Sequence, residues 1–443
     1  MAGYCFYSET KDSNIEWVGE IPEHWEVKPL FGVASTESLK NTHGEETNVL
    51  SLSYGNIIQR NVDKNFGLLP ASFNTYQLVN AGEIILRLTD LQNDKNSLRV
   101  GHSSQQGIIT SAYLKLAAKE NKLSGRYLYR LLHSYDTTKV FYGMGGGLRQ
   151  SMAFDDMKRL PTITPPLEEQ QQIADFLDYE TARIDTLIDK QQQLIQLLKE
   201  KRQAVISHAV TKGLNPDAPM KDSGIEWLGE VPEHWDVSRF GYISQIVRGG
   251  SPRPAGDPTL FNGDYSPWVT VAEITKDDEI YLKETEAFLT KKGSDQCRVF
   301  KSGTLLLSNS GATLGVPVIL NIDANANDGV VGFENLKLDS EFSYFYLSSL
   351  TDDLRERVKQ GSGQPNLNTD IVKNIFVPIP PAPEVEEIVE FIHGVRSHFN
   401  ALQDKAILGI RLLQERRSAL ISAAVTGKID VRGWQPPAKS QPC

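Results

Sequence analysis

Apolar residues recur at helical spacing along two long segments of the chain. The first segment carries them at Ile173, Leu177, Ile184, Leu187, Leu194, Leu198 and Val205. The second segment carries them at Ile392, Phe399, Leu402, Leu413 and Leu420. Steps near three and four residues predict two long helices, each with one heptad-like apolar seam.

Neither helix is expected to stay alone in water. A helix of about 40 residues is roughly 60 Å long, and a single apolar stripe along it needs a partner. The two seams match in length and period, which favours pairing with each other over docking on separate cores. The sequences PPLEEQQ at residues 165–171 and TKGLNPDAP at residues 211–219 are typical of a helix start and a helix end.

A mixed region precedes each long helix. In the first region, GEIILRLTD and GIITSAYLKL are apolar runs punctuated by glycine, as are GTLLLSNSGATLGVPVIL and DGVVGFENLKL in the second. A helical pattern follows in both, in GRYLYRLLHSYDTTKV and in SYFYLSSLTDDLRERVKQ. Both regions are therefore expected to be mixed α/β.

The two halves of the chain are copies of one unit. KDSNIEWVGEIPEHWEV at residues 11–27 and KDSGIEWLGEVPEHWDV at residues 221–237 agree at 13 of 17 positions. The ends of the long helices, residues 197–213 and 412–428, match at an offset of 215. The order of phrase, mixed region, Pro-Pro and long helix thus occurs twice.

The repeat leads to a fold class. Because a mixed region precedes each helix, antiparallel pairing would put the regions at opposite ends of the pair. We expect an α+β protein in which two mixed α/β regions flank an antiparallel two-helix coiled coil, with an internal pseudo-two-fold repeat. Each phrase would lie beside a helix C-terminus and act as a structural clasp, through Trp17 and Trp25 in one copy and Trp227 and Trp235 in the other. No nucleophile or metal spacing accompanies the histidine in either EHW, so it is expected to pack.

Composition sets the broad class. The chain has 443 residues, of which 40% are hydrophobic and 23% charged, enough for two or three globular domains. The three cysteines are scattered and indicate neither a disulfide framework nor a zinc site. The first residues do not form a signal peptide, and no apolar run could span a bilayer. We expect a soluble cytoplasmic protein.

Charge differs between the two regions. The net charge is −10, yet residues 28–165 hold 16 basic and 11 acidic side chains, whereas residues 238–380 hold 14 and 18. An acidic chain can still present a local basic face to nucleic acid. The second region would need a small patch, or help from a partner.

Several loops carry side chains suited to DNA. They are RGGSPRP at residues 248–254, LSNSGATLG at residues 307–315, and GSGQPNLN at residues 361–368, which aligns with GGLRQSMA at residues 146–153. Arg, Gln, Asn, Ser and Thr contact base edges and phosphates, although the same residue types are common in ordinary turns. The candidate DNA-binding residues are Arg60, Lys64, Arg87, Thr89, Arg149, Gln150, Arg248, Ser251, Arg253, Ser308, Asn309, Thr313, Gln364 and Asn366.

Two other classes of function compete with DNA reading. FYGMGGG at residues 141–147 is similar to the loop that binds S-adenosylmethionine in methyltransferases. It follows a helical pattern instead of a strand, and no Asn/Asp-Pro-Pro-aromatic motif accompanies it, which argues against an enzyme. No Walker-type nucleotide motif is present either. A coiled-coil protein–protein adaptor is the remaining alternative.

The chain resembles the specificity subunit of type I restriction–modification systems. The resemblance rests on IEWVGEIPEHW and IEWLGEVPEHW, on PPLEEQQQIADFLD, on GSGQPNLN, and on AVTKGLNPDAPMKDSGIEWLG with AVTGKIDVRGW. Two departures are GGGLRQSMAF, which lacks the Gln-Pro-Asn of its counterpart, and PPAPEVEEIVEF, which lacks the Glu-Glu-Gln opening of the first helix. In this order and in duplicate, the motifs are specific.

The resemblance implies a function for the whole chain. Such subunits do no chemistry, read a bipartite sequence in double-stranded DNA, and hold the two readers apart by their helices. Two methyltransferase subunits dock on the helices and modify adenine, and motor-nuclease subunits join for ATP-dependent cleavage. This chain would bind no cofactor or metal, whereas its partners would use S-adenosylmethionine, ATP and Mg, and no membrane would be involved. The helix-pairing positions named above would also form the partner interface.

The resemblance also assigns the segments. Residues 1–27 are an N-terminal arm with the first phrase, 28–165 a first target-recognition domain, 166–215 the first spacer helix, 216–237 a linker with the second phrase, 238–380 a second target-recognition domain, 381–430 the second spacer helix, and 431–443 a disordered tail.

Overall fold

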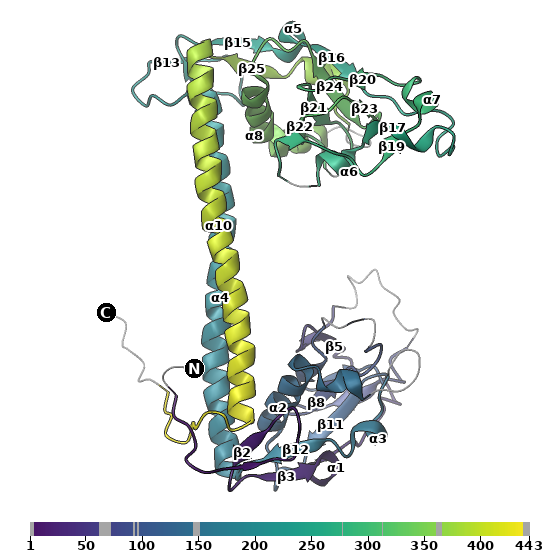
Figure 1. Ribbon diagram of the computed structural model, residues 1–443, viewed down its shortest axis with the longest axis vertical. Coiled ribbons are helices and arrows are strands. Elements are labelled where there is room, and N and C mark those ends of the chain that lie inside the picture. Colours follow the sequence, from purple (N-terminus) through teal and green to yellow (C-terminus); the bar gives the residue numbers. More distant parts are fainter. Residues whose placement is uncertain are drawn as a thin grey trace. The chain divides into compact units, whose positions relative to one another are not determined.

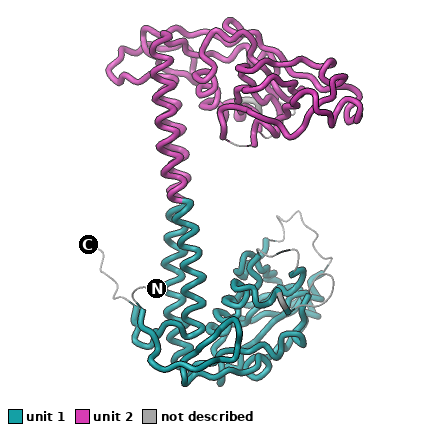
Figure 2. Tube along the Cα trace, in the orientation of Figure 1, with its two compact units in different colours: residues 1–192, 407–443 teal, residues 193–406 magenta. Residues whose placement is uncertain are grey.

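The computed structural model describes residues 4–61, 72–91, 94, 97–144, 151–276, 278–311, 313–359 and 366–436. The chain divides into two compact units, Met1–Gln192 with Ile407–Cys443, and Gln193–Ala406 (Figure 2). Both units are mixed α/β. Each contains part of two long helices, α4 (Leu167–Lys212) and α10 (Ala382–Val425) (Figure 1). Within the described ranges, no helix is both long and apolar enough to cross a membrane.

The first unit is built on a small antiparallel sheet. Its strand order is β4 (Ala34–Ser35), β11 (Leu114–Ala118), β8 (Ile84–Leu86) and β9 (Val100–His102). Paired beside it are β5 (Leu50–Ser53) with β6 (Asn56–Gln59), β7 (Gln77–Val79) with β10 (Gly107–Ile109), β1 (Thr10–Asp12) with β2 (Glu20–Pro22), and β3 (Glu26–Pro29) with β12 (Pro161–Thr164). The helices before α4 are α1 (Leu30–Val33), α2 (Gly125–Thr137), the 3₁₀ helix η1 (Val140–Gly143) and α3 (Phe154–Met157).

The central strand of this sheet is covered on both faces. Ile84 and Leu86 join the core that includes Leu128 of α2, whereas Ile85 belongs to a second cluster with Leu52 of β5. Successive side chains of a strand point to opposite faces. An unbroken apolar run is therefore the pattern that a strand buried on both faces requires.

The second unit contains two sheets. One has the order β16 (Gln245–Arg248), β24 (Val330–Glu334), β21 (Leu305–Ser308), β22 (Pro317–Leu320) and β18 (Tyr281–Leu282). The other has the order β19 (Phe288–Leu289), β17 (Phe261–Val269), β23 (Ala324–Ala326) and β20 (Val299–Phe300). Separate pairs are β13 (Met220–Asp222) with β14 (Glu230–Pro232), and β15 (Asp236–Arg239) with β25 (Phe376–Ile379). The helices between α4 and α10 are α5 (Phe240–Ile243), α6 (Val271–Ile274), α7 (Lys291–Ser294), α8 (Ser340–Lys359) and α9 (Thr369–Lys373).

Strand β21 of the second unit repeats the arrangement of β8. Leu305 and Leu307 pack in the core with Phe345 of α8. Leu306 points to the opposite face and packs with Phe300 of the other sheet. The same rule of alternation therefore explains the central strand in both units.

Elements of the two units recur at the offset found in the sequence. Helices α2 and α8 begin at residues 125 and 340, α3 and α9 at 154 and 369, β12 and β25 at 161 and 376, and α4 and α10 at 167 and 382. Each pair of starts differs by the same 215 residues. Residues at this offset can therefore be compared directly.

Helices α4 and α10 contact each other within each unit. In the first unit, Arg417 Nε lies 2.9 Å from Asp185 Oδ1. In the second, Arg202 Nη1 donates to Asn400 Oδ1 over 2.8 Å. The contact residue in α4 moves forward from Asp185 to Arg202, while its partner in α10 moves back from Arg417 to Asn400. The contacting parts of the two helices therefore run antiparallel.

The predicted seam residues differ in burial. Those that are buried are Ile173, Leu177, Ile184, Ile392 and Leu420. Leu187 and Leu194 are 45% and 43% exposed, and the intermediate ones are Leu198, Val205, Phe399, Leu402 and Leu413. The buried positions belong to the cores that the helices share with the globular parts of their units. A pair of helices buries only a narrow stripe of side chains, so the apolar residues are less buried where the globular part of the unit does not pack on the pair.

Each repeated phrase grips the first turn of a long helix. Trp25 Nε1 donates to Glu169 Oε2 over 2.7 Å, and His24 Nε2 lies 2.5 Å from Glu169 Oε1. In the second copy, the corresponding bonds run to Glu384. They join its Oε2 to Trp235 Nε1 over 2.9 Å and its Oε1 to His234 Nε2 over 2.6 Å. We call each set of three residues a clasp. The tryptophan is fully buried in both.

The same tryptophans lie against the end of the other long helix. Gly427 and Gly213 follow α10 and α4 with φ of +70° and +74°, a conformation that suits glycine at a helix C-terminus. A Cβ at either position would come within 3.2 Å of the ring of Trp25 or Trp235. Each clasp therefore joins the end of one helix to the start of the other.

The other tryptophan of each phrase lies outside the clasp. Trp17 packs edge-on against Tyr135 at 6.1 Å, and Trp227 packs against Phe376 at 5.9 Å. Trp17 and Trp227 thus contact the globular part of each unit, whereas Trp25 and Trp235 contact the ends of the long helices.

Part of the segment expected as a disordered tail is packed. Val431 is 2% exposed, and Trp434 stacks edge-on against Phe176 at 5.4 Å. Gln172 donates to the Trp434 carbonyl. Val431 is therefore part of the core and Trp434 contacts α4, whereas residues 437–443 lie outside the described part of the chain.

Candidate nucleic-acid interface

Three predicted loop residues of the second unit converge on the turn before β24. Ser251 Oγ donates to Asp328 Oδ1 over 2.7 Å, and Arg248 Nε donates to the Asp328 carbonyl over 2.8 Å. Asn309 Nδ2 reaches the same carbonyl at 3.4 Å. Loops that are far apart in the sequence thus form one polar surface.

Asn309 ties these loops together through its backbone as well. Its N–H donates to Gly329 over 2.9 Å, and its carbonyl accepts from Leu367 over 2.7 Å. Ser310 pairs with the exposed Asn366 as an isolated bridge. The side chain of Asn309 is fully buried, and its Oδ1 has no hydrogen-bond partner among the described residues.

Ser308 and Thr313 shape their loop from within. Ser308 Oγ donates to the Thr313 carbonyl over 2.7 Å and accepts from Val316 N–H over 2.9 Å. Its side chain is fully buried. Ser308 and Asn309 therefore support the loops in this structure and do not face solvent, whereas Arg248 and Arg253 are exposed.

The carboxylate of Asp328 is the electrostatic centre of this surface. The hydrogen bond from Ser251 lowers the pKa of Asp328, and the charges of Arg248 and Arg253 lower it further. Burial and the Asp328 charge together raise the pKa of Cys297. An ionised carboxylate flanked by exposed guanidiniums presents both an acceptor and donors to a ligand.

Asp328 was missed by the sequence analysis. Its signal is the Asp-Gly pair in ANANDGVV, a dipeptide typical of a tight turn between two strands. The longer run DGVVGFENLKL predicts a strand and gives no sign of a site. A turn residue becomes a site residue only when other loops fold onto it.

The first unit organises its predicted residues differently. Arg87 pairs with Asp94, whose pKa is held well below the usual range by hydrogen bonds from Ser97. Arg99 is fully buried and donates to the carbonyls of Thr89, at 2.8 Å, and of Arg87, at 3.2 Å.

Arg99 therefore fixes the loop that carries Arg87 and the exposed Thr89. Arg99 is not among the predicted residues, since burial of an arginine and its partners is not visible in the sequence pattern. The half-buried Arg60 lies at the end of β6, where its N–H donates to Val49 over 2.8 Å. Lys64, Arg149, Gln150 and Gln364 lie outside the described residues.

The candidate cofactor loop follows a helix in the structure, not a strand. The FYGM part of the candidate cofactor loop forms η1 and the residue after it, directly behind helix α2. Such cofactor loops follow strands of a doubly wound sheet. Among the described residues, no group of three His, Cys, Asp or Glu side chains is arranged to hold a metal ion.

Comparison with solved structures shows the fold. A chain from a structural study of complex assembly and conformational transition of the type I R-M system superposes with a TM-score of 0.68 at 17% identity. The match covers 91% of this chain and 98% of that one. The HsdS subunit from Thermoanaerobacter tengcongensis superposes with a TM-score of 0.50 at 16% identity, over 92% and 98% of the two chains.

Sequence comparison agrees with these structures. The chain is 24% identical over 352 residues to the type I restriction enzyme MjaVIII specificity subunit of Methanocaldococcus jannaschii, covering 74% of this chain and 76% of that one. It is 22% identical over 350 residues to the EcoBI specificity subunit of Escherichia coli, covering 75% and 71%. The family described as the type I restriction modification DNA specificity domain matches residues 91–197 and 232–410, more than half of the chain. The chain therefore belongs to the type I restriction–modification DNA specificity family.

Proposed function

We propose that this chain is the non-catalytic subunit that gives a type I restriction–modification complex its DNA sequence specificity. Residues 28–165 and 238–380 would be two target-recognition domains, each reading one half of a bipartite target in double-stranded DNA. The observation that supports this most strongly is that the family match falls in both halves of the chain. Two readers in one polypeptide can differ in sequence, so the two half-sites can differ as well.

The polar surface around Asp328 supports DNA reading by the second domain. Arginine contacts guanine edges or phosphates, and a carboxylate accepts a hydrogen bond from cytosine N4. Arg248→Ala or Arg253→Ala would then relax or weaken recognition of one half-site and leave the other unchanged. An equal loss at both half-sites would contradict the division of labour between the domains.

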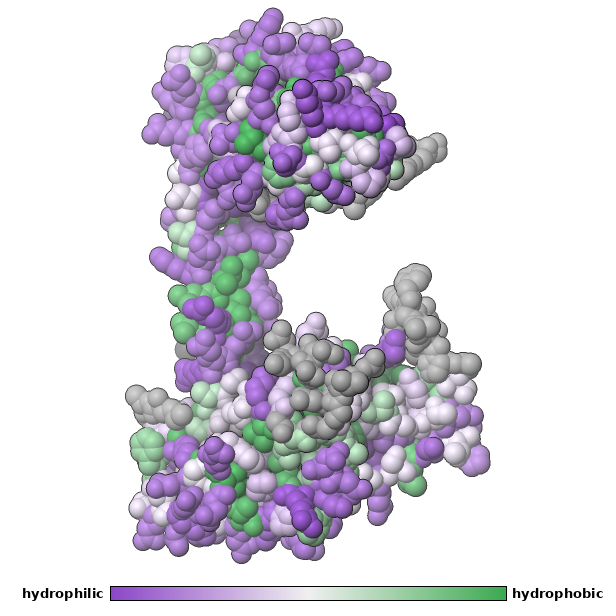
Figure 3. Space-filling model, turned by 45° about the vertical axis from the view of Figure 1, so that its right-hand side comes forward, coloured by the Kyte–Doolittle hydropathy of each residue, from purple (hydrophilic) through white to green (hydrophobic). Residues whose placement is uncertain are grey.

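The long helices would hold the readers apart in a pseudo-two-fold arrangement and carry the partner subunits. Apolar side chains appear on the surface of the paired helices in Figure 3. In the first unit the exposed ones on α4 and α10 include Leu187, Ile407, Leu408 and Leu412. Apolar side chains left in solvent at this density favour a protein interface. We assign the surface to two methyltransferase subunits, with motor-nuclease subunits joining for cleavage.

The chemistry would belong to the partners. An adenine must leave the base stack before its amino group can be methylated, and S-adenosylmethionine would be bound by the methyltransferase. ATP and Mg would serve the motor-nuclease. The reader would hold the duplex in register during these steps and bind no cofactor itself.

The decisive experiment is methylation-resolving sequencing of DNA from cells that express the methyltransferase partner with and without this chain. Methylated adenines in a split motif with a fixed unread gap, found only when the chain is present, would support the proposal. Exchanging residues 28–165 should then change one half of the motif alone. A methylation pattern that ignores the chain would favour a protein–protein adaptor.

Two binding measurements separate the remaining alternatives. The assembled complex should bind duplex DNA with a steep dependence on salt, because phosphate contacts release counterions. A protein–protein adaptor would not show this dependence. Calorimetry of the purified chain with S-adenosylmethionine should give no binding, and saturable binding would instead favour a divergent methyltransferase.

A further inference from the structure

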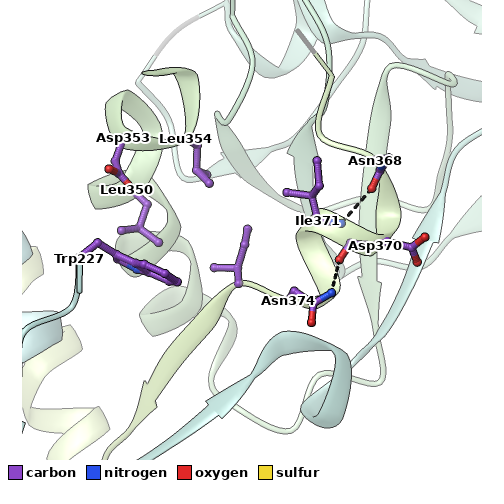
Figure 4. A pocket seen from close by; sticks show the side chains of 9 residues that line it. Trp227, Leu350, Asp353, Leu354, Asn368, Asp370, Ile371 and Asn374 are labelled. Carbon is purple, nitrogen blue, oxygen red and sulfur yellow. Dashed lines mark hydrogen bonds between the residues drawn. The ribbon is translucent and has the colours of Figure 1, made fainter. Parts of the chain in front are cut away.

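A pocket of about 410 Å³ opens in the second unit beside Trp227, the tryptophan that does not enter the clasp (Figure 4). Trp227, Leu350 and Leu354 line one side, and Ile371 faces them from α9. The remaining lining residues are Asp353, Asn368, Asp370, Asn374 and Ile375. The walls are apolar and the rim is acidic.

The equivalent corner of the first unit is filled by a tyrosine. Tyr135 is 1% exposed, packs edge-on against Trp17, and donates its hydroxyl to the Pro161 carbonyl over 3.0 Å. At the offset of 215, Tyr135 corresponds to Leu350, and Trp17 is the counterpart of Trp227 in the other copy of the phrase. The second unit therefore lacks the ring that closes this corner.

In the second unit, the corresponding carbonyl accepts a hydrogen bond from a tyrosine one helical turn earlier in the helix. Tyr346 donates its hydroxyl to the Phe376 carbonyl over 2.7 Å, and Phe376 corresponds to Pro161. The backbone acceptor is thus occupied without a tyrosine at position 350. Loss of that ring leaves no buried polar group behind, so the open corner is compatible with a stable fold.

The opposite wall of the pocket is apolar because α9 is capped differently from α3. In the first unit, Asp156 in α3 accepts a hydrogen bond from the N-cap Ala153 N–H over 2.7 Å. In the second, the N-cap Asn368 accepts from Ile371 N–H over 2.9 Å. Ile371 corresponds to Asp156. Because the Asn368 side chain caps α9, the position of Ile371 is not needed for capping and can hold an apolar residue. Ile371 is 41% exposed and faces the pocket.

Helix α8 also extends beyond its counterpart. It has 20 residues, whereas α2 has 13, and the added turns carry Asp353 and Leu354. Leu354 contributes to the apolar wall, while Asp353 and Asp370 place carboxylates at the rim. The Asp370 side chain is 83% exposed beside Lys373 at 3.5 Å, so its carboxylate is accessible and favours cationic side chains over phosphate.

We propose that this pocket receives an aromatic side chain of the methyltransferase subunit, with a lysine or arginine beside it in that subunit's sequence. The proposal rests on the assembly proposed above. Tyr135 provides the internal precedent, because it shows that an aromatic ring fits edge-on against the corresponding tryptophan. Aromatic side chains in such pockets contribute strongly to protein interfaces. Among the described residues, Tyr135 closes the corresponding corner of the first unit, so two identical methyltransferase subunits would contact the chain unequally.

The test uses the full chain and the purified methyltransferase subunit, with the dissociation constant of the complex as the readout. Leu350→Tyr copies the first unit and closes the pocket, and Ile371→Asp copies its polar wall. Each should weaken association at least tenfold while the thermal unfolding of the free chain is unchanged. If Leu350→Tyr fails to fold, Ile371→Asp on the exposed helix surface still decides.

A matched pair of variants tests the acidic rim. Asp370 pairs with Lys373 at 3.5 Å, and the corresponding Asp155 pairs with Lys158 at 2.9 Å. Asp370→Lys should weaken association severalfold, whereas Asp155→Lys should change it less than twofold. Hydrogen exchange in the complex should show protection at residues 350–354 and 368–375 and none at the corresponding first-unit residues.

The outcomes separate the two proposals. If the unmodified chain does not associate with the methyltransferase, the proposed assembly is wrong and the pocket assignment fails with it. If it associates and both pocket variants bind within twofold of it, the pocket assignment alone is overturned. Protection of these residues by duplex DNA without the methyltransferase would also overturn it, in favour of a nucleotide contact.

Discussion

The two clasps form the same bonds in different surroundings. Glu169 accepts from Trp25 and also from the Tyr7 hydroxyl over 3.2 Å, and its side chain is 11% exposed. Glu384 accepts from Trp235 with its side chain 37% exposed. Burial raises the pKa of Tyr7, and the charge of Glu169 raises it further, so Tyr7 acts as a neutral donor.

The difference comes from outside the repeated phrase. Tyr7 precedes the first phrase, and Arg432 after α10 lies over its ring at 4.9 Å. At the corresponding place before the second phrase stands Asp217, which is exposed. Identical residues therefore form identical contacts, while flanking residues decide how much water reaches them.

The largest expected effect is common to both clasps. Trp25→Ala or Trp235→Ala should each lower the free energy of unfolding by about 3–5 kcal/mol, because each ring is fully buried against a helix end. Chemical denaturation, with hydrogen exchange in the affected unit as the probe, would measure this loss of unfolding free energy. Trp17→Ala is the control, since Trp17 is 45% exposed and should cost clearly less. Equal losses for Trp17 and Trp25 would contradict the clasp.

Replacing the acidic residue should separate the two clasps. Glu169→Ala leaves the buried donors of Trp25 and Tyr7 unpaired and should cost about 2–4 kcal/mol. Glu384→Ala opens the second clasp to water that can replace the carboxylate, so its cost should be about 1 kcal/mol or less. The comparison is made by urea denaturation of both variants at the same salt concentration. If the two losses were the same, burial around the clasp would not control its strength.

Between pH 7.5 and 5, a pH-dependent loss of stability should be larger in the first unit than in the second. Burial lowers the pKa of His133 in α2 to about 3, while its counterpart in α8 is Ser348. Below about pH 6.5, His133 therefore binds a proton in the unfolded state but not in the folded state. Stability is therefore lost as the pH falls below about 6.5, by about 1.4 kcal/mol for each pH unit.

The measurement compares the unmodified chain with His133→Gln between pH 7.5 and 5. Hydrogen exchange of α2 should accelerate on acidification in the unmodified chain and less so in the variant, while α8 provides the internal reference. His102, whose pKa burial also lowers, should leave a smaller residual effect in the variant. An identical pH response of both proteins would rule out His133 as its source.

The smallest effect tests whether two tyrosines play one role. Tyr135→Phe and Tyr346→Phe each remove a hydroxyl from corresponding carbonyls, at Pro161 and Phe376. Each should cost about 1 kcal/mol, the net value of one buried hydrogen bond. Thermal unfolding of the two variants should shift by similar amounts. A loss for one variant only would show that the carbonyls are not equivalent.

Much of the architecture can be predicted from the sequence. The 3.6-residue periodicity predicted both long helices, and α4 begins at Leu167, directly after the Pro-Pro pair. The offset of 215 was visible between residues 197–213 and 412–428, and it recurs in the starts of α2 and α8. Such features are local or repetitive, so they leave a direct trace in the order of residues.

The candidate site could be predicted only in part. Arg248 and Ser251 were selected from one loop, but Asp328, on which they converge, lies about 80 positions along the chain. Likewise, nothing in the pattern distinguishes the buried Arg99 from the half-buried Arg87. Hydrogen-bond partners that are far apart in sequence are decided by the packing of whole elements.

The sequence by itself determined the helices, the duplication and the family, because periodicity, repetition and motif order are properties of the chain alone. Only the tertiary structure decided which acidic residue each phrase binds, which loop residues face solvent, and that Leu350 leaves a pocket where Tyr135 fills one. These features depend on the space between elements. In a closely packed protein, the absence of one aromatic ring at Leu350 and a different helix cap at Asn368 are enough to open a pocket. No single segment of the sequence shows this.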